Sequence, residues 1–106
     1  MKYFPRLSLA CPFEIVEMCD EVTAVSMGDK AADYHGVILL KNESTRFMFE
    51  QLQAGTTLLE LIQACMDKYP DSPVDEVGPQ VIKFLDMIRE KGILVVDKTR
   101  GIKVED

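Results

Sequence analysis

Residues 36–45 read GVILLKNEST, and this stretch joins the two kinds of structure expected in the chain. Residues 37–41 form an apolar run that is too short for a helix, so we expect a buried strand there. Asn42 follows at once, and its side-chain oxygen can cap a helix while Glu43 complements the positive end of the helix dipole. The stretch therefore predicts a change from sheet to helix at Asn42.

Upstream of this stretch, apolar and polar residues alternate in patches with period two, which is typical of β-structure. Two β-rich runs, residues 13–18 and 22–27, surround a short acidic break, which predicts an antiparallel hairpin. A polar loop reaching about His35 leads to the strand at 37–41. These segments predict a three-stranded antiparallel sheet, with residues 1–12 as an N-terminal extension.

Downstream, helix signals follow one another. The first helix is expected to run through Leu52 and to stop at Gly55, which can adopt the left-handed conformation. Thr57 and Glu60 form a capping box for a second helix, which Pro70 ends. Its apolar stripe comprises Leu58, Leu61, Ile62, Cys65, Met66 and Tyr69.

A third helix is expected to begin between residues 75 and 79, because Pro79 is tolerated only in the first turn. Gly92 closes it, and its inward stripe comprises Val77, Val81, Phe84, Leu85 and Ile88. Residues 93–96 and 102–104 surround a turn-like segment and could form a terminal hairpin. The order predicts an α+β fold of winged helix-turn-helix type: a three-stranded antiparallel sheet, three helices and a C-terminal segment that could form a hairpin.

Length and composition bound the class of protein. The 106 residues make about one domain, residues 1–106, in which 97–106 are a C-terminal tail or wing. The chain is 47% hydrophobic and 28% charged, which excludes a disordered or fibrous chain. Its 12 Lys and Arg against 18 Asp and Glu give a net charge of −6, which opposes binding to nucleic acid.

Cysteine usage and hydropathy suggest a compartment. Cys11, Cys19 and Cys65 show no C-x-x-C spacing, so we expect reduced, buried thiols rather than disulfides or a zinc site. The apolar start of the chain is too short for a signal sequence, and no window approaches a membrane span. We therefore expect a cytoplasmic protein without a membrane partner.

Catalytic chemistry is not visible in the sequence. There is one histidine, His35, which we interpret as a loop residue, and neither a nucleophile motif nor a phosphate-binding glycine loop is present. The acidic groups lack the spacing of a calcium loop. We expect a protein that is not an enzyme and that holds no metal or cofactor.

The strand at 37–41 suggests a binding surface instead. It is apolar and free of Pro and Gly, so it is either covered by the third helix or serves as a template for an incoming extended peptide. Ile82 and Met87 lie outside the inward stripe of the third helix and can line a groove. Periodicity alone leaves both interpretations open.

The sequence resembles the PqqD family over about residues 13–96. The resemblance rests on residues 36–45, Phe47 to Leu52, Gly55-Thr56-Thr57, Glu60-Leu61-Ile62 and the spacing of Val81, Phe84-Leu85, Ile88 and Gly92-Ile93-Leu94. It implies a small winged-helix-like peptide chaperone, as in pyrroloquinoline quinone biosynthesis. Such a protein binds the leader of a ribosomally synthesised precursor peptide by β-strand addition and presents it to a radical SAM-type maturation enzyme.

The resemblance also implies a binding site. The leader would pair with the backbone of Val37, Ile38, Leu39, Leu40 and Lys41, and Ile82, Leu85 and Arg89 would line the groove. Met87 and Lys91, on the opposite flank of the helix, are the alternative lining.

A winged-helix DNA-binding regulator is the alternative function. The third helix mixes Lys83 and Arg89 with Asp86 and Glu90, and the two acidic side chains would repel DNA. Whether two copies of the chain form a homodimer stays open.

Overall fold

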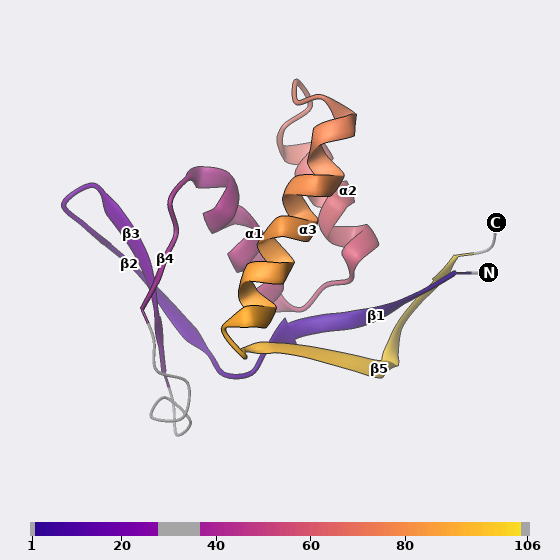
Figure 1. Cartoon of the computed structure of the whole chain (residues 1–106), viewed down its shortest axis with the longest axis horizontal. Helices are drawn as coiled ribbons and strands as arrows, with labels where there is room; N and C mark the ends of the chain where they lie inside the picture. The colour runs from indigo at the N-terminus through magenta and orange to yellow at the C-terminus, as the bar shows by residue number, and fades with distance from the viewer. Residues whose placement is uncertain (1, 28–36, 105–106) are drawn as a thin grey trace.

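A three-stranded antiparallel sheet lies beside a group of helices in the computed structural model, which describes residues 2–27 and 37–104 (Figure 1). The α+β class with antiparallel sheets is confirmed. Within the described residues, a strand at Lys2–Leu9 precedes this sheet and a single strand at Leu94–Val104 follows the helices, whereas the sequence predicted an extension and a hairpin at these two places.

The predicted hairpin is present. Strands β2 (Phe13–Met18) and β3 (Glu21–Ser26) pair from Phe13 opposite Ser26 to Met18 opposite Glu21. A two-residue turn joins them, in which Cys19 and Asp20 both have positive φ, 49° and 69°. Turns of this handedness match the twist of the flanking strands, although Gly and Asn are the usual residues there.

Strand β4 (Val37–Leu39) completes the sheet in the order β2-β3-β4. It pairs antiparallel with β3, with Ile38 opposite Ala24 and Leu39 opposite Thr23. The Leu40 N–H extends the ladder by donating to the Val22 carbonyl at 2.8 Å. The strand predicted at 37–41 is thus present, with a shorter regular part. The polar loop before it lies outside the described residues.

Both predicted helix starts in the middle of the chain are confirmed. Helix α1 (Glu43–Ala54) begins after Asn42, whose side chain accepts from the Thr45 N–H at 2.8 Å. Helix α2 (Leu58–Lys68) begins after Thr57, whose hydroxyl accepts from the Glu60 N–H at 3.2 Å. Gly55, at φ 91°, ends α1 as predicted.

Helix α3 (Val74–Glu90) begins earlier than predicted, and Pro79 lies inside it. The first turn of α3 holds Asp75 and Glu76, which favour a helix N-terminus. The proline removes the hydrogen bond to the carbonyl four residues earlier, that of Asp75. Both Asp75 and Pro79 are exposed, so water can satisfy that carbonyl and the helix tolerates the proline beyond its first turn.

The predicted C-terminal hairpin is wrong. Strand β5 (Leu94–Val104) is continuous and pairs with β1 (Lys2–Leu9), a segment expected to be an extension outside the sheets. The register jumps from Arg6 opposite Asp97 to Pro5 opposite Gly101, so residues 98–100 bulge out. Pairing with β1 gives eight residue pairs, far more than a short hairpin within 93–104 could make.

The turn-like contacts predicted at residues 97–101 are present, but they form this bulge and do not reverse the chain. The Asp97 carboxylate accepts from the Thr99 N–H at 3.0 Å and the Thr99 hydroxyl at 2.6 Å. These bonds hold the pKa of Asp97 below its ordinary value. Gly101 is required by close approach, since a Cβ there would lie 2.3 Å from the Phe4 carbonyl oxygen. We call the β1–β5 pair the terminal ribbon.

The core lies between the helices and the inner face of the three-stranded sheet. Its largest fully buried side chains, Phe49, Leu52, Leu61, Val81 and Ile88, all come from helices. The sheet adds Phe13, Ala24 and Ile38, followed by Leu40. The Phe13 and Phe49 rings meet edge to face at 5.4 Å between centroids, which joins sheet and helices through one aromatic contact.

Candidate functional site

Strand β4 lies at the edge of its sheet. Strand β3 occupies one side, and within residues 2–27 and 37–104 no strand pairs with the other side. Residues opposite each other in an antiparallel pair alternate between bonded and non-bonded pairs. Because Leu40 and Val22 are a bonded pair, the N–H and C=O groups of Leu39 and Lys41 point away from β3. The outer edge therefore offers main-chain donors and acceptors.

Side chains near this edge alternate between the two faces of the sheet. Ile38 and Leu40 are each 3% exposed and join the core. Leu39 is 44% exposed, and Lys41 is exposed as well. The edge is thus fixed from the inner face and open on the outer one.

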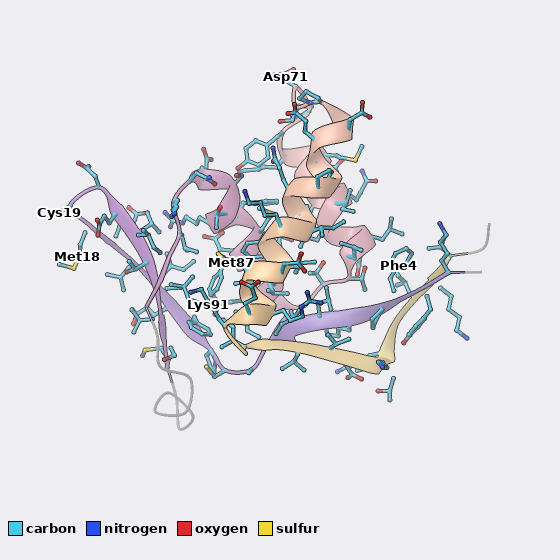
Figure 2. The ribbon with its side chains drawn as sticks, viewed as in Figure 1. Phe4, Met18, Cys19, Asp71, Met87 and Lys91 are labelled. Atoms are coloured by element: carbon cyan, nitrogen blue, oxygen red, sulfur yellow. The ribbon has the colours of Figure 1, made fainter. Side chains whose placement is uncertain are left out.

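A groove of about 540 Å³ runs between this edge, the start of α1 and one flank of α3. Its lining residues are Leu39, Lys41, Asn42, Ser44, Thr45, Met48, Gln80, Lys83, Phe84 and Met87. Figure 2 shows Met87 on the side of α3 that faces the three-stranded sheet. The groove combines an apolar floor with an open strand edge, so an extended chain can lie along it.

The groove lies on the flank of α3 that carries Met87. Gln80, Lys83, Phe84 and Met87 recur at helical spacing and share this flank. Lys91 caps the end of α3 and is exposed, but it does not line the groove.

The residues expected on the other flank do not line the groove. Ile82 is 50% exposed, and Leu85 packs partly buried against the core. The Arg89 guanidinium donates to the Asp86 carboxylate at 3.0 Å. Of the expected residues, the structure therefore brings Leu39, Lys41 and Met87 together.

Sequence reasoning missed the contribution of α1. Ser44 and Thr45 lie in its first turn, and both hydroxyls donate to the Asn42 carboxamide oxygen, at 2.7 and 2.9 Å. Met48 follows one turn later at the floor of the groove. The signal was the capping residue itself, because only three residues separate the end of the edge strand from the start of α1, which keeps the first turn of the helix close to that edge.

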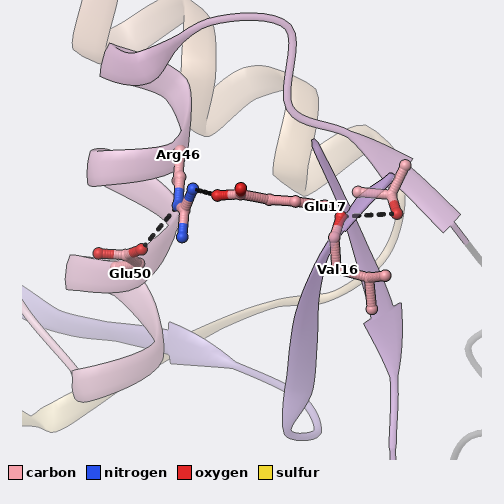
Figure 3. A network of polar contacts seen from close by, with 5 residues as sticks. Val16, Glu17, Arg46 and Glu50 are labelled. Carbon is pink, nitrogen blue, oxygen red and sulfur yellow. Dashed lines mark hydrogen bonds and ion pairs between the residues drawn. The ribbon is translucent and has the colours of Figure 1, made fainter. Parts of the chain in front are cut away.

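An ion-pair network holds the sheet against α1 (Figure 3). The Arg46 guanidinium on α1 contacts the Glu17 carboxylate on β2 and donates to Glu50 at 3.1 Å. The hydrogen bond to Glu17 is the main cause of a raised pKa for the Arg46 guanidinium, and the hydrogen bond to Glu50 adds to it. The network ties β2 to the helix, and β4 follows through the ladder of β3.

Among residues 2–27 and 37–104, no group of three or more His, Cys, Asp or Glu could hold a metal ion. Cys11 and Cys65 are buried free thiols, and burial raises the pKa of Cys65. Cys19 is exposed at the β2–β3 turn, so its predicted burial is wrong. His35 lies outside the described residues.

A helix that crosses a membrane needs about 20 predominantly apolar residues. None of the helices within the described residues is both long and apolar enough to cross a membrane.

Comparison with protein families identifies a family model that matches most of the chain. The family model described as "Coenzyme PQQ synthesis protein D (PqqD)" matches residues 29–94, more than half of the chain. The matched segment includes β4, the helices and the start of β5, and it begins later than the expected resemblance from about residue 13. No curated protein and no solved structure matches the chain.

Proposed function

The chain belongs to the PqqD family, and from this premise we propose that it is a non-catalytic peptide-binding accessory protein. Its ligand is the leader segment of a ribosomally synthesised precursor peptide. The leader adds as a strand to the outer edge of β4 and lies in the groove between β4 and α3. Family membership supports the general role, and the edge geometry supports this mode of binding.

The open edge of β4 is the observation that carries the proposal. Strand addition takes its affinity from main-chain hydrogen bonds and its selectivity from pockets for alternate side chains. Leu39 and Lys41 supply outward main-chain groups, while Met48, Phe84 and Met87 supply an apolar floor. No reacting group is needed for this function.

Presentation to an enzyme is the second half of the role. We propose a radical SAM-type maturation enzyme as the partner, by analogy with the family. A leader held by a protein that also contacts this enzyme raises the local concentration of the precursor at the active site. The accessory protein thereby accelerates modification without touching the reacting atoms.

Amide chemical shifts test the binding mode directly. ¹⁵N-labelled protein is titrated with synthetic leaders of short precursor peptides encoded beside its gene. Strand addition is expected to shift the amides of residues 38–41 and those of Lys83, Phe84 and Met87 most strongly. If every such leader leaves these amides unmoved, the proposed function is wrong.

A Leu39→Pro variant tests strand addition at a single main-chain N–H group. The substitution removes an N–H that points away from β3, so the ladder to β3 keeps its hydrogen bonds. One lost main-chain bond of about 1 kcal/mol, together with the steric bulk of the ring at the edge, should weaken leader affinity about tenfold. Leu39→Ala, which keeps the N–H, is the matched control. Equal affinities for the two variants would contradict strand addition at this edge.

Duplex DNA serves as the comparison ligand in these titrations. We expect no shifts with DNA even at low salt, where attraction to phosphates is strongest. Salt-dependent shifts on α3 would instead favour the DNA-binding alternative.

A further inference from the structure

The lining of the groove is positively charged, whereas the chain as a whole is negatively charged. The chain carries 18 Asp and Glu against 12 Lys and Arg, yet the described lining of the groove contains Lys41 and Lys83 and no carboxylate. Both lysines are exposed, and neither has an ion-pair partner among the described residues. A ligand here meets local positive charge on an acidic protein, which favours acidic side chains in that ligand.

The two lysines approach the groove from different sides. Ile38 and Leu40 point to the core, so Lys41, like Leu39, belongs to the outer face of the sheet. Lys83 stands on α3, beside Phe84 and Met87 of the same flank. Because successive side chains of a strand point to opposite faces, a docked strand would meet Lys41 with one face and Lys83 with the other.

The apolar part of the lining lies on the helix side. Met48, Phe84 and Met87 come from α1 and α3. Lys83 and Met87 are one helical turn apart, about 6 Å, which matches two residues of an extended strand. The face of the strand that meets Lys83 therefore also meets this apolar surface two positions away.

We propose that the groove selects an extended peptide with one acidic residue on each face, and with an apolar residue two positions from the acidic residue that faces α3. This inference rests on the proposed peptide-binding function and adds the chemistry of the ligand. The two acidic residues are separated by an odd number of positions, adjacent in the simplest case. Lys41 forms an ion pair with one carboxylate across the strand pair, and Lys83 forms an ion pair with the other from the helix.

The test uses defined synthetic peptides with the full-length protein. The first peptide is short, acetylated, amidated and rich in threonine, with one leucine and two adjacent glutamates, the first two positions after the leucine. The second replaces both glutamates with glutamine. The third places the glutamates two positions apart, on one face. Affinities come from the amide shifts of residues 38–41 at low salt.

Two exposed ion pairs should make the adjacent-glutamate peptide bind about fivefold more tightly than the glutamine peptide. The third peptide should fall between them, because its carboxylates can reach only one lysine. Lys41→Gln and Lys83→Gln should each reduce the fivefold preference to about twofold, and the double variant should remove it. Lys103→Gln on β5, which changes the net charge equally, is the control and should leave the preference unchanged.

The outcomes separate this inference from the proposed function. Equal binding of the glutamate and glutamine peptides, or a preference lost equally in Lys103→Gln, overturns the selection of acidic residues while strand addition stands. Failure of all three peptides to bind also overturns it. The titration with precursor leaders alone decides the proposed function.

Discussion

The two sheets of this molecule differ in whether a further strand can pair with their edges. In the terminal ribbon, the outer edge of β1 is blocked: Pro5 has no N–H, and Leu7 exchanges two hydrogen bonds with Thr56, at 2.6 and 2.9 Å. The outer edge of β5 is interrupted by the bulge at residues 98–100 and carries Lys103. Proline, bulges and lysines are common protections against unwanted strand pairing. The ribbon is exposed but closed to a further strand.

Strand β4 has none of these protections among residues 37–41 other than its short length and Lys41. It is anchored by Ile38 and Leu40, and its open side meets a groove instead of bulk solvent. Exposure alone therefore does not mark a docking strand. A strand edge becomes a binding site where the main chain is free and a neighbouring element supplies side-chain contacts.

The two sheets also differ in what they give to the core. The three-stranded sheet contributes Phe13, Ala24 and Ile38, whereas β1 contributes one buried residue, Leu7. Damage to the core should therefore disturb the groove, and damage to the ribbon should leave it intact. The following substitutions test this division, from the largest expected effect to the smallest.

Phe49→Ala should have the largest effect. Phe49 is fully buried and meets the Phe13 ring edge to face, so its loss leaves a cavity between α1 and the three-stranded sheet. The free energy of unfolding should fall by about 3–5 kcal/mol in chemical denaturation. Val96→Ala in the ribbon, 45% exposed, is the control and should cost less than about 1 kcal/mol. Similar losses for both variants would refute the division.

Gly101→Ala should act on the ribbon alone. The added Cβ would lie 2.3 Å from the Phe4 oxygen and 2.9 Å from the Pro5 Cα, and both of these are backbone atoms. Backbone must shift to relieve this overlap, which we expect to cost about 1–3 kcal/mol in unfolding free energy. Leader affinity, measured by titration of the folded variant, should equal that of the parent. A weakened leader affinity would show that the ribbon supports the groove.

Local features of the fold could be predicted from the sequence. The β2–β3 hairpin, the Asn42 and Thr57 caps and the end of α1 at Gly55 each depend on residues a few positions apart. The strand edge at residues 37–41 was likewise visible as an apolar run without Pro or Gly. These elements follow from short-range patterns, which a single sequence displays.

The terminal ribbon could not be predicted in this way, because its partners stand at opposite ends of the chain. Lys2 pairs with Val104, and the turn chemistry at Asp97 looks the same whether it reverses a strand or makes a bulge. The groove flank of α3 was ambiguous for a related reason. Ile82 and Met87 both lie outside the inward stripe, and only the placement of α3 relative to α1 and β4 decides that Met87 faces the groove.

Gly78→Ala should give the smallest change. Gly78 lies inside α3, and a Cβ there meets no atom within 4 Å apart from its chain neighbours and the backbone of its own helix. Alanine restricts the unfolded chain and favours a helix interior, but its Cβ also meets the ring of Pro79, which disfavours helical backbone at the preceding residue, so the unfolding free energy should change by less than about 0.5 kcal/mol. The position lies off the groove flank, so leader affinity should stay unchanged. Because Gly78→Ala and Gly101→Ala make the same chemical change, a loss of stability confined to Gly101→Ala would trace that loss to backbone overlap in the ribbon. A loss of stability in both variants would instead show that alanine itself, and not backbone overlap, is the cause.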